Sequence, residues 1–126
     1  IEVNEELYQM QRKYFNKSGF GPQIKQHTGD ALEIVPSLNQ TFDLVFIDAQ
    51  KVNYDAYFEA VIKKTKPGSI ILSDNVLWSG KVVEPLQKSD KATAALLEYN
   101  KKLKEDPRVE TVLLPIRDGL TLSRVL

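Results

Sequence analysis

The amino-acid sequence predicts an α/β protein whose mostly parallel sheet is covered by helices on both faces. Three observations support this fold class. Short apolar runs alternate along the chain with segments of helical periodicity. The run at 42–47 is almost continuously apolar, as in a parallel strand that is buried on both faces. The runs at 109–116 and 120–125 are joined by Arg117-Asp118-Gly119, which indicates a hairpin that adds one antiparallel strand.

The first part of the chain is predicted to alternate between strand and helix. Residues 1–3 read as the end of a strand, and Asn4 is a typical N-cap for the helix that follows. The apolar spacing carries this helix to Ser18-Gly19, where the glycine favours its end. A short strand is predicted over 23–27 and a short helix over 31–38.

The rest of the chain continues this alternation. A helix is predicted over 53–64 because its apolar residues recur at i, i+3, i+4, i+7 and i+8. A turn at 66–68 leads to a second buried strand over 69–73, and a further helix is predicted over 90–105. We therefore expect residues 1–126 to form a single domain, with ligands beyond the carboxyl ends of its strands.

Composition excludes several classes of function. Hydrophobic residues make up 42% of the 126 residues and charged residues 27%, as in ordinary globular proteins. Seventeen basic residues balance seventeen acidic ones, which argues against nucleic acid or an acidic membrane surface as partners. The chain has no cysteine and His27 is its only histidine, so thiolate sites and histidine-rich sites are excluded. The absence of cysteine fits a reducing compartment, and we expect a cytoplasmic protein.

Four predicted strands end on acids or amides, and these residues would share one edge of a parallel sheet. They are Glu2, Asp30, Asp48 and the pair Asp74-Asn75. The separation of Asp48 and Asp74 is that of one crossover unit, which suits neighbouring strands about 4.8 Å apart. Two carboxylates so close would repel each other, and a divalent cation would remove the conflict. Oxygen ligands from Asp48, Asp74 and Asn75 suit Mg²⁺, Mn²⁺ or Ca²⁺.

Each of these residues also has a simpler interpretation. A single Asp at a strand end caps a helix or turn more often than it binds metal, and Asp74-Asn75 alone fits a turn. Lys51 would ordinarily be an exposed lysine at the start of a helix. Beside a cation, however, its amine could remove a proton from a hydroxyl that the cation holds.

A phospho-receiver domain, in which Asp48 accepts phosphate beside Mg²⁺, is an alternative of another class. Receivers carry paired acids after the first strand and a Lys-Pro pair after the fifth. In this chain Lys66-Pro67 precedes a strand, so the pattern disfavours a receiver.

Five segments carry a family resemblance. They are EVN at 2–4, GDAL at 29–32, FDLVFIDAQK at 42–51, ILSDNVLWSGKV at 71–82 and RDGLTLSRV at 117–125. Together they resemble the cation-dependent O-methyltransferases, the family of catechol and caffeoyl-CoA O-methyltransferases, in its small bacterial branch. The resemblance covers nearly the whole chain. It implies a Rossmann-like domain that binds S-adenosylmethionine and transfers its methyl group to a phenolic hydroxyl of a vicinal diol.

The resemblance implies a cofactor site and a cation site. Glu2 matches the acid that holds the ribose hydroxyls, Asp30 and Ala31 match the stretch beside adenine, and Asp48 also lies beside the cofactor. The residues that match the three protein ligands of the cation are Asp48, Asp74 and Asn75.

The resemblance also implies the residues that act on the acceptor. Lys51 matches the lysine that deprotonates the attacking hydroxyl. Trp78 matches an aromatic wall of the acceptor pocket, and Asp118 falls where some members contact the acceptor. A small phenolic molecule is therefore the expected substrate, and a homodimer is the expected assembly.

Two departures from the family pattern matter. Gln50 stands where many members carry an acid, and we expect this to change the local charge without loss of the cation. Family members begin with helices, a first strand and a glycine-rich loop, which have no counterpart here. We therefore expect the fold to be incomplete at its N-terminus and the chain alone to bind the cofactor weakly or not at all. An inactive folding or assembly unit remains an alternative function.

Overall fold

The computed structural model describes residues 1–126 and divides them into two compact units, Ile1–Asn39 and Gln40–Leu126. Whether the two form the single domain predicted from the sequence stays a prediction. None of the helices combines the length and the apolarity that crossing a bilayer requires.

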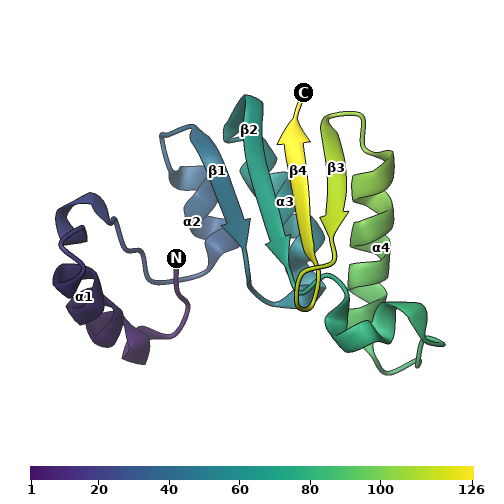
Figure 1. Ribbon diagram of the computed structural model, residues 1–126. Helices are drawn as coiled ribbons and strands as arrows, with labels where there is room; N and C mark the ends of the chain where they lie inside the picture. The colour runs from purple at the N-terminus through teal and green to yellow at the C-terminus, as the bar shows by residue number, and fades with distance from the viewer. The chain divides into compact units, whose positions relative to one another are not determined.

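The first unit contains the helices α1 (Tyr8–Lys17) and α2 (Ala31–Ser37) (Figure 1). A single 3-10 turn precedes α1, and the Asn4 side chain accepts a hydrogen bond from the Glu6 N–H at 3.0 Å, as expected of an N-cap. Gly19 adopts a φ of 80° directly after the last turn of α1, which confirms the predicted end of this helix.

The prediction of strands at residues 1–3 and 23–27 of this unit is wrong in extent. Only an isolated parallel bridge between Glu2 and Thr28 forms, and residues 24–27 are in no strand. Gly21–Gln23 is a 3-10 helix with Pro22 at its start, where proline's fixed φ favours a helical turn over an extended chain.

The second unit is a four-stranded sheet with two helices. Its strands are β1 (Phe42–Ile47), β2 (Thr65–Asp74), β3 (Val109–Leu114) and β4 (Leu120–Val125), and its helices are α3 (Tyr54–Ile62) and α4 (Lys91–Glu105). The strand order is β1-β2-β4-β3. β1 and β2 pair in parallel, whereas β4 is antiparallel to both of its neighbours. Three strands therefore run one way and β4 runs the other, as Figure 1 shows and as the hairpin predicted.

The strand β2 is longer than expected because it includes residues 66–68, which were predicted to be a turn. The register between β1 and β2 shifts after the Phe42–Thr65 pair, so that Leu44 faces Ile70. This irregularity takes up the extra residues of β2 and lets the two strands run on together to their carboxyl ends.

The helices α3 and α4 cover one face of the sheet. Alternate residues of β2, among them Ile71 and Ser73, are buried on that face, and the Tyr99 ring of α4 packs edge-on against Tyr54 and Phe58 of α3. These aromatic pairs join the two helices above the strands. Burial of such large rings contributes strongly to the free energy of folding.

The expectation that β1 is covered on both faces is wrong for this unit. Leu44 is 60% exposed and Phe46 is 57% exposed, and both lie on the face that α3 and α4 do not cover. The β3 residue Val112, which shares this face through the β4 register, is also exposed. An apolar run thus indicated a strand, but it could not show whether helices cover both of its faces.

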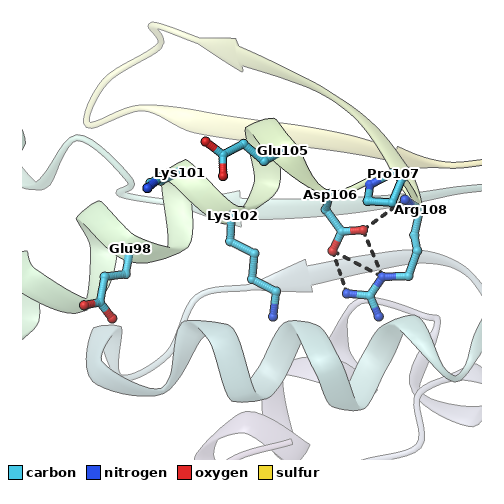
Figure 2. Close-up of a pocket in the computed structure, with 7 residues that line it drawn as sticks. All are labelled: Glu98, Lys101, Lys102, Glu105, Asp106, Pro107 and Arg108. Atoms are coloured by element: carbon cyan, nitrogen blue, oxygen red, sulfur yellow. Dashed lines mark hydrogen bonds and ion pairs between the residues drawn. The ribbon is translucent and has the colours of Figure 1, made fainter.

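Charged side chains also tie α3 to α4. Figure 2 shows Lys102 pointing away from α4 and Arg108 hydrogen-bonded to Asp106. Both cations lie 2.6 Å from the carboxylate of Glu59 on α3, and Lys102 also pairs with Asp55. Arg108 and Lys102 stabilise the ionised carboxylate and lower the pKa of Glu59 to about 2.

We predict that Glu59→Gln lowers the free energy of unfolding by roughly 1 kcal/mol at neutral pH. Because the pKa of Glu59 in the folded protein lies below its ordinary value of 4.5, the ion pairs stabilise the fold above about pH 4.5. That stability is lost as the pH falls toward 2, so the difference between the variant and the wild type should shrink over this range. Urea unfolding at several pH values measures it, with Glu98→Gln on the exposed side of α4 as the control. If the difference in free energy of unfolding between Glu59→Gln and the wild type stays constant with pH, the ion pairs of Glu59 do not stabilise the fold as proposed.

Candidate functional site

The carboxyl ends of β1 and β2 lie side by side in the second unit. Ile47 and Ser73 are paired in the parallel ladder. Asp48 follows β1 directly, Asp74 is the last residue of β2, and Asn75 comes next. The prediction that these two strands are neighbours is confirmed, and ligands of such sheets bind at this edge.

Lys51 is the residue around which this edge is arranged. Its side chain is only 8% exposed, so the interpretation as an ordinary exposed lysine is wrong. The ammonium nitrogen lies 3.1 Å from Asn75 Oδ1, 3.4 Å from Asp48 Oδ1 and 3.4 Å from the backbone oxygen of Asp74. A buried ammonium is costly unless its N–H groups meet oxygens, and these three residues supply them.

Tyr54 is a site residue that sequence reasoning missed. Its buried hydroxyl accepts a hydrogen bond from the Lys51 ammonium and donates one to the backbone oxygen of Asp74 at 2.8 Å. Burial raises the pKa of Tyr54 well above its usual range, so the hydroxyl keeps its proton. The helical spacing of residues 53–64 explains Tyr54 only as part of an apolar face. The signal that could have found it is its position three residues after Lys51, which places both side chains on one helical turn.

The loop after β2 carries Trp78 and is bent by unusual backbone angles. Asn75, Trp78 and Ser79 have φ values of 59°, 50° and 56°, in the left-handed region that non-glycine residues avoid. Each such residue costs on the order of 1–3 kcal/mol and persists where its surroundings impose it. The bend brings the Trp78 ring to 5.8 Å from the Lys51 ammonium, so the predicted pocket wall lies beside the predicted base.

Asp118 fixes this loop from the β3–β4 hairpin. Its carboxylate accepts a hydrogen bond from the Ser79 N–H at 2.5 Å, and its backbone oxygen accepts one from the Leu77 N–H at 2.9 Å. The backbone oxygen of Gly119 accepts a third from the Val76 N–H at 3.1 Å. The predicted contact of Asp118 with an acceptor stays a prediction, but its contact with the Trp78 loop is direct.

The predicted cofactor residues other than Asp48 lie in the first unit. The Glu2 carboxylate accepts a hydrogen bond from the Asn4 N–H at 2.9 Å, which lowers the pKa of Glu2. The Glu2–Thr28 bridge brings this acid near the turn before α2, where Asp30 caps the helix and Ala31 is its first residue. The shared edge predicted for all four strand ends is therefore confirmed for β1 and β2, and it stays a prediction for Glu2 and Asp30.

The donor chemistry of the β1–β2 edge suits a hard divalent cation. The structure has no group of three or more His, Cys, Asp or Glu side chains arranged for a metal ion, and the predicted set instead combines two carboxylates with one amide. Oxygens of all three predicted ligand residues already surround a cation, namely the ammonium of Lys51. The edge is thus built to hold positive charge.

Two hollows in the second unit contain none of the predicted site residues. One, drawn in Figure 2, is lined by residues of α4 and the turn after it, and two of its charged side chains, Lys102 and Arg108, form the ion pairs with Glu59. The other lies between α4 and the hairpin. The predicted site is an edge of the sheet rather than either hollow.

The comparisons with known proteins identify the family. The sequence profile described as O-methyltransferase matches residues 1–126. The chain belongs to the O-methyltransferase family. It is 35% identical over 135 residues to caffeoyl-CoA O-methyltransferase 5 of Nicotiana tabacum and 37% identical over 134 residues to caffeoyl-CoA O-methyltransferase 1 of Eucalyptus globulus. Each match covers 98% of this chain, but only 56% and 54% of those relatives, so the chain spans about half their length.

Solved structures of O-methyltransferases match the fold. The enzyme of Bacillus cereus in complex with SAH is 26% identical, with a TM-score of 0.89, and the match covers 98% of this chain and 60% of that one. TomG of Streptomyces achromogenes in complex with SAM is also 26% identical with a TM-score of 0.89, and the match covers 98% and 59%. The Rossmann-like methyltransferase fold predicted from the sequence is thereby confirmed.

We predict that Gly119→Ala destabilises this family member by about 2–3 kcal/mol. Gly119 has a φ of 80°, and a Cβ there would lie 2.5 Å from Leu77 Cγ and 3.1 Å from the Leu77 backbone nitrogen. Gly68→Ala is the matched control, because Gly68 has a φ of 89° with open space around it and should lose only about 1 kcal/mol. If both variants lose the same free energy of unfolding in urea, the hairpin does not approach the Trp78 loop as closely as the structure shows.

Proposed function

We propose that the protein containing this chain transfers the methyl group of S-adenosylmethionine to a hydroxyl of a catechol-like or other vicinal-diol phenolic acceptor, held by a divalent cation. The observation that carries the proposal is the arrangement of Asp48, Asp74, Asn75 and Lys51 at the carboxyl edge of β1 and β2. Membership in the O-methyltransferase family supports the reaction class.

In this proposal, the oxygens of the β1–β2 edge bind the cation. They come from the carboxylates of Asp48 and Asp74 and the side-chain oxygen of Asn75. When bound, the cation favours the ionised form of a hydroxyl that it holds, and the cofactor supplies an electrophilic methyl group on a sulfonium. Two adjacent acceptor oxygens would be fixed against this edge, and orientation of this kind supplies much of an enzyme's acceleration.

Lys51, in its neutral amine form after the ammonium has released one proton to solvent, is proposed to take the proton of the attacking hydroxyl on its Nζ. The side chain is buried and fixed between Tyr54 and Asn75, so its nitrogen has a defined position. The Trp78 ring, 5.8 Å from Nζ, would flank a planar acceptor, and Asp118 would keep that ring in place through the loop. These three side chains bind, orient and deprotonate, without any covalent bond to the substrate.

The residues proposed to hold the cofactor are Glu2 for the ribose hydroxyls, Asp30 and Ala31 beside adenine, and Asp48. The Glu2 carboxylate suits this role because an ionised carboxylate accepts hydrogen bonds from hydroxyl groups. We further propose Mg²⁺, or Mn²⁺ or Ca²⁺, as the cation, a cytoplasmic location and a homodimer. The basis for these is the family resemblance together with the composition.

A second candidate function is a folding or assembly unit without activity of its own. The observation that favours it is that the chain spans about half the length of the curated relatives that it matches. The phospho-receiver alternative is wrong, because the O-methyltransferase profile matches residues 1–126.

We predict that methyl transfer by the complete protein to a catechol is abolished by EDTA and restored by Mg²⁺. Asp48→Asn should reduce the rate at least about 100-fold, because it removes one charged ligand of the cation and one partner of Lys51. Transfer of label from radioactive S-adenosylmethionine measures both effects.

Asp43→Asn is the control, because Asp43 lies on β1, the strand that leads to Asp48, with an exposed side chain that pairs with Lys66. Its rate should match the wild type. Transfer that persists in EDTA would contradict the cation-dependent mechanism. The same assay on residues 1–126 alone separates the two candidate functions, because transfer by this chain would exclude the inactive unit.

A further inference from the structure

The ammonium of Lys51 lies among the oxygens that the proposed cation would use. It is 3.1 Å from Asn75 Oδ1 and 3.4 Å from Asp48 Oδ1, and it also lies 3.4 Å from the backbone oxygen of Asp74. Because the Lys51 side chain is only 8% exposed, its ammonium is bound by hydrogen-bond acceptors of the protein rather than by bulk water. Lys51 therefore places a positive charge among the oxygens of this acidic edge.

A divalent cation and this ammonium cannot share the same oxygens without cost. Two positive charges a few ångströms apart repel each other, and the burial of Lys51 limits how far water screens that repulsion. Each lone pair of Asp48 Oδ1 or Asn75 Oδ1 that points at the ammonium is also unavailable to a metal ion. Binding of a cation should thus require Nζ to give up its contacts with these two oxygens.

Tyr54 offers the ammonium a place that no proposed ligand side chain occupies. Its hydroxyl already accepts a hydrogen bond from Nζ, and Nζ lies 4.5 Å from the centre of its ring. The hydroxyl is itself fixed, because it donates its one proton to the backbone oxygen of Asp74 at 2.8 Å. The fully buried ring is held edge-on by Tyr99, with 5.5 Å between ring centres.

We propose that Lys51 competes with the divalent cation for the oxygens of Asp48 and Asn75, and that Tyr54 is the positioning residue that holds the ammonium when the cation displaces it. The inference rests on the cation site of the proposed function. In this inference Tyr54 does not contact the substrate. Lys51 controls cation binding in addition to its proposed role in proton transfer. Its consequence is that metal affinity depends on a lysine and a tyrosine that are not ligands.

The test is Mn²⁺ binding to residues 1–126, measured by the electron paramagnetic resonance signal of free Mn²⁺. Lys51→Met removes the competing charge and should tighten binding about tenfold. Tyr54→Phe keeps the ring but removes the hydroxyl, which leaves the ammonium on the ligand oxygens and should weaken binding about threefold. In the double variant the loss caused by Tyr54→Phe should disappear, because no ammonium remains to be positioned.

Lys101→Met, on the exposed side of α4, is the matched control for loss of one positive charge and should leave the affinity unchanged. Thermal unfolding checks that each variant is folded, and Lys51→Gln replaces Lys51→Met if the latter is not. A merely structural role for Tyr54 would weaken binding equally with and without Lys51.

The outcomes separate this inference from the proposed function. Unchanged or weaker Mn²⁺ binding in Lys51→Met, with binding still lost in Asp48→Asn, overturns the competition and leaves the cation site intact. An equal effect of Tyr54→Phe in both backgrounds overturns the positioning role. Absence of Mn²⁺ binding in the wild type and in every variant overturns the competition together with the cation site.

Discussion

The parallel pairing of β1 with β2 is the constraint on which the rest of the site depends. The register that places Ile47 opposite Ser73 brings Asp48, Asp74 and Asn75 to one edge, although Asp48 follows β1 and Asp74 ends β2. A slip of one residue would turn every side chain of the slipped strand to the opposite face of the sheet and separate these oxygens. The covered face resists such a slip, because Ile71 and Ser73 are buried on it beneath α3 and α4.

A buried lysine follows from this arrangement of oxygens. Negative and partial negative charges gathered at one edge need a positive charge, and Lys51 supplies it at the cost of leaving water. Tyr54 lessens that cost with its hydroxyl and ring, and Trp78 provides a second aromatic surface. The strained loop that carries Trp78 is held in turn by Asp118. Lys51 and the Trp78 loop are therefore coupled, since each depends on the edge formed by β1 and β2, and the proposed cation would bind at the same edge.

Sequence reasoning succeeded where periodicity and end signals agree. The strand at 42–47, the helix that Asp90 caps and the terminal hairpin were all found within a few residues. It failed where a strand needs a partner of sufficient length, as at 23–27, because β propensity is a property of pairing rather than of a short segment. The exposed Leu44 and Phe46 show the same limit, since an apolar run does not reveal what covers each face.

The edge of the sheet was predictable from the sequence, but the burial of Lys51 was not. Strand-end acids and their spacing indicated the edge, and the family resemblance implied which of its oxygens would hold a cation. The burial of Lys51 and the hydroxyl of Tyr54 depend on how a turn folds back over the strand ends, which no spacing along the sequence specifies. Tyr54 occupies an apolar position of its helix. The spacing therefore explained its ring as a core residue and gave no sign that its hydroxyl binds Lys51.

The most direct test of the account is anomalous X-ray diffraction from crystals of the protein soaked in Mn²⁺. The account predicts a single strong anomalous peak within bonding distance of the side-chain oxygens of Asp48, Asp74 and Asn75, with Lys51 Nζ moved off those oxygens and still bonded to Tyr54. No peak at this edge, or a peak there with Lys51 unmoved between Asp48 and Asn75, would contradict it.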